Sequence, residues 1–142
     1  MLPRVAEASP TLIKQIPLFS GLDGRELRSV AQSMKERTFA AGSSVLEEGQ
    51  GGVGFFVIES GSARVSVGGR EVATLGAGDH FGEIALIGDV DRTATITAET
   101  DLHCYGMSAW EFRPLVEANA SIAWKLLQTL AKRLAEAGQS RA

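Results

Sequence analysis

The chain has 142 residues, of which 44% are hydrophobic, and a formal net charge of −3. This size suits one globular domain, residues 1–142, with its own hydrophobic core, and it excludes a second domain. No apolar run is long enough for a membrane span, and the first ten residues lack the basic-then-apolar order of a secretory signal, so we expect a cytoplasmic protein without a membrane partner. The slightly acidic charge and the scattered basic residues argue against nucleic-acid binding by this chain alone.

Residues 11–37 are predicted to be helical in short pieces. A first turn ends before Pro17, because a residue that precedes proline is disfavoured in the helical region. Asp23 is the expected N-cap of a new helix, with Glu26 at the capping-box position. Apolar residues then recur at helical spacing: Leu27, Val30, Ala31 and Met34.

Residues 38–107 change to a period of two, which predicts short β-strands separated by glycine-bearing turns. We expect strands at 45–46, 55–58, 63–67, 72–74, 92–98 and 104–105. Gly68 and Gly69 can form a two-residue hairpin turn, which requires positive backbone angles. Short, closely spaced strands and sixteen glycines are typical of a β-roll or jelly roll, a fold that can enclose a small ligand.

The most informative stretch is 81–98, FGEIALIGDVDRTATITA. Phe81, Gly82 and Glu83 end an extended run, and residues 84–87 are predicted to form one buried helical turn that Gly88 closes. Gly82 lets the backbone come close to a ligand. The first amides of the turn lack intrahelical partners and can bind an anion, while Glu83 among them is either a cap or an acceptor for a hydroxyl group.

Residues 92–98 alternate, so Ala94, Ile96 and Ala98 share one face with Arg92. An arginine at the mouth of an apolar interior needs an anionic partner, because burying its charge unpaired costs several kcal/mol. Arg92 and the free amides imply a phosphate-sized anion, and Glu83 implies a hydroxylated neighbour. A structural ion pair between Glu83 and Arg92, with no ligand, is the alternative.

This stretch resembles the phosphate-binding cassette of cyclic nucleotide-binding domains, FGE(I/L)AL...R(T/A/S)A(T/S). The segment IPLFSGL at 16–22 and the residues at 48–49 and 56–61 also resemble that family. The resemblance implies that Gly82 and Glu83 contact the ribose hydroxyl side, that the turn amides and Arg92 hold the cyclic phosphate, and that the ligand is cAMP or cGMP, with no cofactor. The cyclic nucleotide-binding residues would be Phe81, Gly82, Glu83, Ile84, Ala85, Arg92, Thr93 and Ala94.

The resemblance also implies an α+β, mainly β fold. Its parts are an eight-stranded β-roll (jelly roll) with the cassette at 81–95, short N-terminal helices, a one-turn cassette helix, and two C-terminal hinge and lid helices at 108–138. One departure concerns Val53, where many relatives have a carboxylate that braces the cassette arginine; Arg92 is then braced differently or is freer without ligand. Thr93 occurs with either base, and we favour cAMP as the ligand of a stand-alone domain of bacterial character.

The C-terminal helices carry a wide apolar stripe. Ser108 is an expected N-cap with Glu111 at the capping-box position, Pro114 kinks the first helix, and Asn119 marks a break. The second helix, about 121–137, has apolar residues spaced four and three apart: Ala123, Leu127, Leu130, Leu134 and Ala137. Ile122 and Leu126 widen the stripe. It covers the roll, or the helix of a second copy in a homodimer, or both.

In the family the last helix closes over the purine. The lid residues would be Leu130, Arg133 and Leu134, with a solvated surface role as the alternative for Arg133. Val65 and Val72 are predicted pocket walls.

Leu86 and Phe112 are the predicted hinge. Drawing the cassette turn toward the phosphate would change the contact between Leu86 and the helix that begins at Ser108, and would thereby let the final helix swing over the ligand.

Other classes of protein are less favoured. A cupin-like enzyme usually needs several histidines around a metal, and this chain has only His80 and His103, so no catalytic or metal-binding residues are assigned. A haem bound by His80 is a further alternative. The single cysteine, Cys104, excludes an internal disulfide and is expected to be a packed strand residue.

A transcription factor of the cAMP receptor protein class would continue into a helix-turn-helix domain, whereas this chain stops at Ala142. We therefore expect a sensor domain with an unidentified effector protein, or a fragment of such a factor or of a nucleotide-regulated channel, kinase or acetyltransferase. A degenerate domain is disfavoured because both Glu83 and Arg92 are present.

Overall fold

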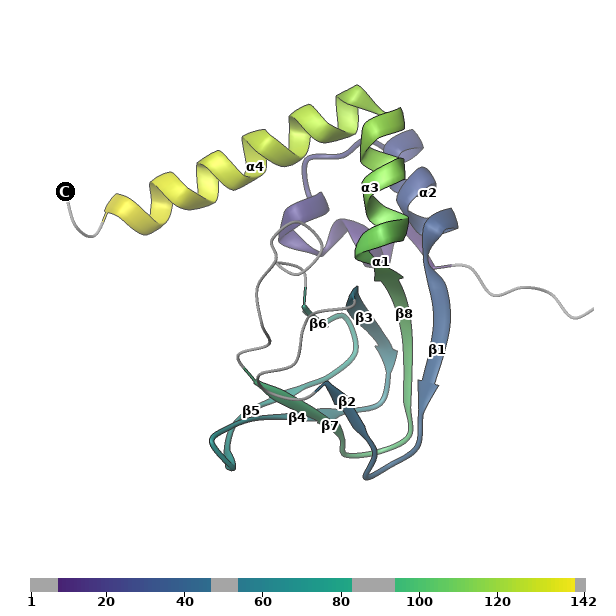
Figure 1. Ribbon diagram of the computed structural model, residues 1–142, viewed down its shortest axis with the longest axis vertical. Coiled ribbons are helices and arrows are strands. Elements are labelled where there is room, and N and C mark those ends of the chain that lie inside the picture. The colour runs from purple at the N-terminus through teal and green to yellow at the C-terminus, as the bar shows by residue number, and fades with distance from the viewer. Residues whose placement is uncertain (1–7, 47–53, 83–93, 140–142) are drawn as a thin grey trace, which may run out of the picture.

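The computed structural model describes residues 8–46, 54–82 and 94–139. The N-terminal helices are α1 (Pro10–Lys14), the 3₁₀ helix η1 (Pro17–Phe19) and α2 (Gly24–Ser33). The strands follow as β1 (Lys35–Phe39), β2 (Ser44–Leu46), β3 (Gly54–Ser60), β4 (Ala63–Val67), β5 (Arg70–Leu75), β6 (His80–Phe81), β7 (Thr95–Ala98) and β8 (Leu102–Ser108). The chain ends with α3 (Ala109–Ala118) and α4 (Ala120–Gln139). Figure 1 shows the strands at one end of the molecule and the helices gathered at the other.

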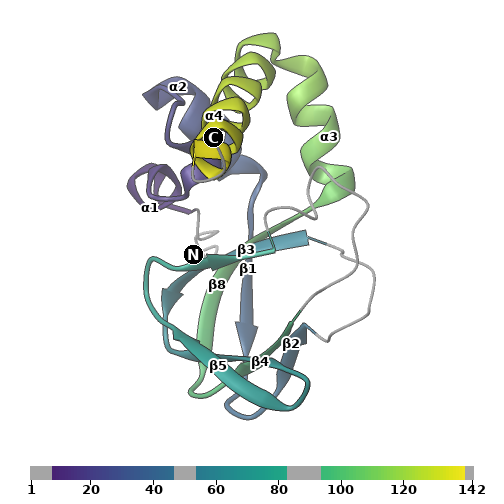
Figure 2. The same ribbon diagram turned by 90° about the vertical axis from the view of Figure 1, so that its left-hand side faces the viewer.

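The strands form two four-stranded antiparallel sheets, in the orders β1-β8-β3-β6 and β2-β7-β4-β5. A core between the sheets contains residues of both, among them Ile58 and Cys104 from the first sheet and Ile96 and Ala98 from the second. The two sheets therefore pack face to face as a roll that is not a closed barrel (Figure 2). The predicted eight-stranded β-roll is confirmed.

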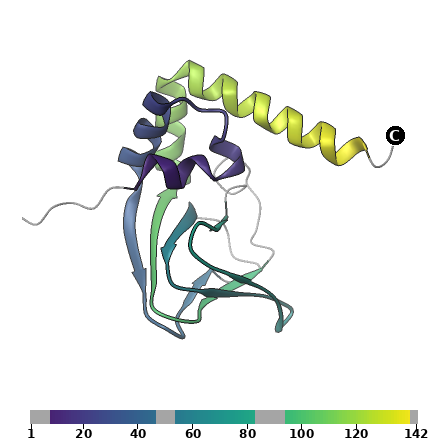
Figure 3. The same cartoon turned by 180° about the vertical axis from the view of Figure 1, so that it is seen from behind.

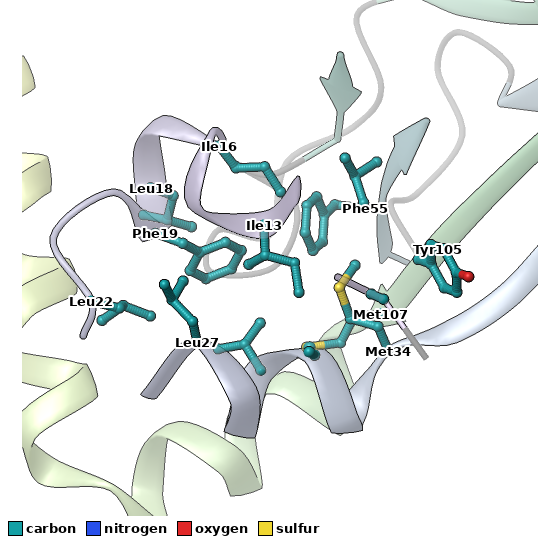
Figure 4. Packing of buried hydrophobic residues seen from close by; sticks show 14 of the residues in the cluster. Ile13, Ile16, Leu18, Phe19, Leu22, Leu27, Met34, Phe55, Tyr105 and Met107 are labelled. Atoms are coloured by element: carbon teal, nitrogen blue, oxygen red, sulfur yellow. The ribbon is translucent and has the colours of Figure 1, made fainter. Parts of the chain in front are cut away.

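The strands β3 and β8 are buried on both faces. Their side chains alternate, so Ile58 and Cys104 point into the roll, whereas Phe55 and Met107 point to the opposite side. On that side they join a second core with residues of the N-terminal helices (Figure 4). The helices thus cover the outer face of the sheet whose inner face lines the roll.

One boundary differs from the expectation that helices extend to residue 37. The helix α2 ends at Ser33, and Met34 already has extended angles, φ −86° and ψ 145°. Lys35 then begins β1, which pairs with β8 from Lys35 to Phe39. Residues 35–38 of this edge strand are all exposed, so they lack the apolar alternation by which a half-buried strand is predicted.

Local signals for turns and helix starts are confirmed. Gly68 and Gly69 have φ of 60° and 78°, and they connect β4 to β5, where Val67 pairs with Arg70. Both predicted capping boxes are present, at Asp23 with Glu26 and at Ser108 with Glu111. Within the described residues, no helix combines the length and apolarity needed to cross a membrane.

Glu26 also connects α2 to α4. Its side chain is 7% exposed, and its Oε1 accepts hydrogen bonds from the Asp23 backbone amide at 2.9 Å and from Lys125 Nζ at 2.6 Å. Its Oε2 accepts a hydrogen bond from Ser121 Oγ at 2.7 Å. The bond from the Asp23 amide and that from Lys125 outweigh burial and lower the pKa of Glu26 from 4.5 to about 2. The carboxylate is therefore ionised and paired at neutral pH.

We predict that Glu26→Gln lowers the free energy of unfolding at pH 7 by about 2 to 3 kcal/mol, because a buried charged acceptor is lost. The pKa of Glu26 is lower in the folded than in the unfolded protein. Its contribution to the free energy of unfolding is therefore complete above pH 4.5 and is lost as the pH falls from 4.5 toward 2. Urea unfolding of both proteins at several pH values should show the difference shrinking toward acid.

Glu117→Gln is the control, because its partner Arg113 is exposed and such pairs contribute little. A difference between wild type and Glu26→Gln that stays constant from pH 7 to pH 3 would contradict the assignment.

Candidate functional site

Only part of the predicted cassette lies within the described residues. Phe81, Gly82 and Ala94 are described. The other predicted nucleotide-binding residues, the hinge residue Leu86 and Val53 lie outside the described residues; the nucleotide-binding residues concerned are Glu83, Ile84, Ala85, Arg92 and Thr93. The structure therefore shows how the two ends of the cassette are held.

Phe81 holds the first end. It is 8% exposed in β6 and pairs with Phe56 of β3. The ring centroids of Phe81 and Phe56 are 5.4 Å apart. Phe56 in turn contacts Phe39 of β1 edge-on, with 5.8 Å between their ring centroids. Burying an aromatic ring contributes on the order of 2 to 3 kcal/mol, so this aromatic row fixes where the chain leaves the first sheet.

Gly82 follows with φ of 84°, in the left-handed region. A side chain there would strain the backbone, whereas glycine adopts this conformation at little cost. The chain can thus turn sharply out of β6 into the cassette. This geometry suits the predicted role of Gly82 as the point where backbone and ligand come close.

Ala94 marks the second end and is partly buried. In β7, which follows it, Ile96 and Ala98 are 4% and 0% exposed, so the predicted apolar face of this run is confirmed. The strand β7 lies in the second sheet, between β2 and β4. The strands that flank the cassette, β6 and β7, therefore belong to different sheets, and each contributes to the core between them, through Phe81 and Ile96.

The two predicted pocket walls differ. Val65 is partly buried against the roll core and pairs with Ile96 of β7. Val72 is 56% exposed, and the register of β5 against β4 shifts at this point, since Val65 pairs with Ala73 and Ser66 pairs with Glu71. Val72 is the extra residue of this bulge. The bulge breaks the strict alternation of side chains along β5, which had predicted that Val72 points into the roll. Only Val65 packs on the interior here, and a ligand contact by either residue stays a prediction.

The roll is also hollow beside α3. A cavity of about 390 Å³ lies between β1, β2, β3, β8 and the first turn of α3, and Phe39, Val45 and Phe56 contribute to its lining. Part of the inner face is therefore accessible without displacing packed side chains.

The predicted lid residues lie on α4. Leu130 is partly buried against the helical core, and Leu134 is 74% exposed. Arg133 lines a groove of about 520 Å³ between η1 and α4. The C-terminal half of α4 projects to one side, past the N-terminal helices, and residues 131–138 are exposed (Figures 1 and 3). We call this the open arrangement of α4.

Phe112, which is predicted to belong to the hinge, is 4% exposed, and its ring centroid lies 6.2 Å from that of Phe19 in η1. Phe112 therefore attaches α3 to the N-terminal helices. The sequence predicted Phe112 as a hinge residue and did not identify this partner. An apolar residue on the buried side of α3 was the only available signal, and it does not identify the contact.

Cys104 and His80, the other residues considered as reactive or metal-binding, lie in strands of the first sheet. Cys104 is buried in β8, as predicted, and burial raises its pKa to about 12, so it is not a reactive thiolate. His80 lies in β6 and pairs with Val57. In the described part of the chain, no three His, Cys, Asp or Glu residues are grouped so that they could hold a metal ion.

Residues 36–119 match the family model described as the cyclic nucleotide-binding domain. The chain is 40% identical over 92 residues to the cAMP-dependent protein kinase regulatory subunit of Yarrowia lipolytica, a match that covers 63% of this chain and 24% of that protein. It is 39% identical over 93 residues to the corresponding subunit of Schizosaccharomyces pombe, covering 65% and 23%. The matched part thus spans about a quarter of these relatives.

Solved structures are similar over most of the chain. The N-terminal domain of a transcriptional regulator from Streptomyces coelicolor A3(2) has a TM-score of 0.82 and 30% identity, covering 89% of this chain and 94% of that one. The catabolite activator protein of Thermus thermophilus has a TM-score of 0.69 and 29% identity, covering 87% and 61%. The cAMP-bound structure of PfPKA-R (141–441) has a TM-score of 0.67 and 26% identity, covering 91% and 46%.

We predict that Gly82→Ala lowers the free energy of unfolding by about 1 to 2 kcal/mol, because alanine is strained at positive φ. It should also weaken binding of cAMP, the ligand expected from the sequence. Gly42→Ala is the matched control, because Gly42 has φ of 87° in the turn between β1 and β2 and a Cβ there would contact nothing within 4 Å. Thermal unfolding and calorimetric titration of both variants test this. Equal affinities for the two would contradict the role of Gly82.

Proposed function

The chain belongs to the cyclic nucleotide-binding domain family, and from this premise we propose that it is a regulatory sensor that binds a cyclic nucleotide, with cAMP preferred over cGMP. The observation that carries the proposal is the placement of the cassette sequence. The strand before the cassette, β6, and the strand after it, β7, lie in different sheets of the roll, and Phe81 and Ile96 of these strands pack in the core between the sheets. The preference for cAMP is supported by relatives whose names state cAMP dependence and by the similar cAMP-bound structure.

In the proposal, different cassette residues bind different groups of the ligand. Glu83 accepts hydrogen bonds from the ribose hydroxyl, next to Gly82, where the backbone comes close. Arg92 and the backbone amides of the turn that contains Ile84 and Ala85 bind the cyclic phosphate, whose negative charge matches both. Phe81, Thr93 and Ala94 complete the site at the two ends of the cassette. Binding is reversible and involves no catalytic residue.

Coupling to the C-terminal helices proceeds through the hinge. Leu86 contacts α3 in the proposal, and Phe112 attaches α3 to η1. Movement of the cassette toward the phosphate shifts α3, and α4 swings from the open arrangement to bring Leu130, Arg133 and Leu134 over the base. The ligand drives this change only if it binds the closed arrangement more tightly than the open one.

The output of the sensor lies outside the nucleotide site. A homodimer through α4 is supported by apolar residues that α4 leaves exposed: Trp124 at 63%, Leu127 at 58% and Leu134 at 74%. An effector protein in the cytoplasm receives the signal. The similar regulatory subunits of cAMP-dependent protein kinase suggest a kinase subunit as a model for such an effector. A piece of a transcription factor is the alternative, supported by the similar regulator domain from Streptomyces coelicolor.

We predict that calorimetric titration detects cAMP binding by the purified chain, with weaker binding of cGMP. Arg92→Ala should abolish binding, and Glu83→Ala should weaken it by about 1.5 to 3 kcal/mol, the scale of a charge-assisted hydrogen bond. Arg64→Ala, an exposed arginine of β4, is the control and should bind like wild type. Failure of wild type to bind either nucleotide at millimolar concentration would refute the proposal.

We also predict that saturating cAMP slows amide hydrogen exchange in residues 108–137, because closure covers and orders α3 and α4. The hairpin of β4 and β5 beyond Val65 serves as an internal reference. Unchanged exchange in residues 108–137, at a ligand concentration that calorimetry shows to be saturating, would rule out the coupling.

A further inference from the structure

Glu26 is a buried charged residue that lies outside the candidate nucleotide site. The contacts of its carboxylate come from two elements that are distant in sequence, since Ser121 and Lys125 follow it by 95 and 99 residues. A capping box requires only the contact between Glu26 and the Asp23 backbone. The two bonds to α4 are therefore additional, and they define a separate role.

We propose that Glu26, Ser121 and Lys125 form a tether that positions α4 in the open arrangement, and that release of this tether limits closure over a bound cyclic nucleotide. The inference rests on the proposed function. Its residues are positioning residues, because none of them belongs to the cassette that binds the ligand.

The geometry of the tether is specific for one placement of α4. Ser121 and Lys125 are one helical turn apart, so they lie on the same face of α4, and both reach the same carboxylate. Hydrogen bonds of 2.7 and 2.6 Å weaken steeply when the atoms separate or the angles change. A rotation of α4 at the break at Asn119 therefore removes both bonds together.

The tether has a larger effect on α4 than its position near the helix start suggests. Ile122 and Leu126 are buried beside it in the helical core, whereas every residue from Ala131 to Gly138 is exposed. The exposed half therefore takes its direction from contacts in the first two turns. The apolar contacts of Ile122 and Leu126 hold α4 on the helical core, and the hydrogen bonds to Glu26 add directional contacts that favour one angle.

The charges around Glu26 favour the intact tether. Lys125 Nζ lies 2.6 Å from Glu26 Oε1 and 3.7 Å from Asp23 Oδ2, so one ammonium group serves two carboxylates of the α2 start. When α4 swings away, Glu26 keeps the hydrogen bond from the Asp23 amide and loses its counter-ion Lys125. The ligand must offset this loss, so the tether lowers the apparent affinity for the nucleotide.

The test compares Ser121→Ala/Lys125→Gln with wild type, because these changes break the tether and leave the α2 capping box intact. The double variant should bind cAMP about three- to tenfold more tightly, since less of the ligand's binding energy is used to open the tether. The single variant Lys125→Arg keeps the ion pair with Glu26 and should bind cAMP with an affinity close to that of wild type. Val30→Ala, in the core face of α2, is the control for loss of stability alone and should leave the affinity unchanged.

A second measurement needs no ligand. Spin labels at Glu136→Cys on α4 and Arg70→Cys on the β4–β5 hairpin report the distance between α4 and the roll, and native Cys104 is too deeply buried to react. The double variant should give a broader or shifted distance distribution than wild type.

An unchanged distribution, or an affinity in the double variant that equals or falls below that of wild type, would overturn the tether. Absence of cAMP binding by wild type would instead refute the proposed function, and the distance measurement would still decide the tether.

Discussion

The structure depends on two neighbouring strands, β3 and β8, that are buried on both faces. Ile58 and Cys104 line the roll, while Phe55 and Met107 on the alternate positions hold the helices. Close-packed interiors transmit displacement, because a side chain cannot move into a neighbour without shifting it. The sheet that lines the interior of the roll therefore also packs, through its other face, against the N-terminal helices. Movement on one face is thereby linked to packing on the other through the backbone that the two faces share.

Polar contacts at helix starts complete this arrangement. In each capping box the glutamate reaches beyond its own helix: Glu26 binds residues of α4, and Glu111 at the start of α3 binds Lys35 of β1 at 3.1 Å. Burial opposes ionisation of Glu111, but its hydrogen bonds to Ser108 and Lys35 outweigh that effect and lower its pKa. The start of α3 is thus attached to the roll, whereas the start of α4 is attached to α2. The break at Asn119 lies between these two attachments.

The sequence was sufficient for features that depend on neighbouring residues. The capping boxes, the Gly68-Gly69 turn and the apolar face of β7 follow from local chemistry, and the eight-stranded roll from a resemblance with specific motifs. Three features depend on distant partners and could not be predicted. The edge strand β1 is polar along most of its length, so only its pairing with β8 identifies it. The exposure of Val72 follows from a bulge in the β4–β5 register. The partners of Glu26 lie on the other end of the chain, and a capping-box motif contains no information about them.

The helix α4 shows why its apolar stripe was ambiguous. Ile122 and Leu126 are buried against the N-terminal helices, whereas Trp124 and Leu127 are exposed. Trp124 lies about 200° around the helix from Ile122, but Leu127 lies only about 100° from Leu126, so the buried and the exposed apolar residues adjoin on one wide stripe. A second copy of the chain could cover the exposed face without moving α4, and the bonds of Glu26 would stay intact. Covering the same face with the roll requires α4 to swing and those bonds to break. The proposed dimer is therefore compatible with the open arrangement, and of its exposed apolar residues only Leu134 also belongs to the proposed lid.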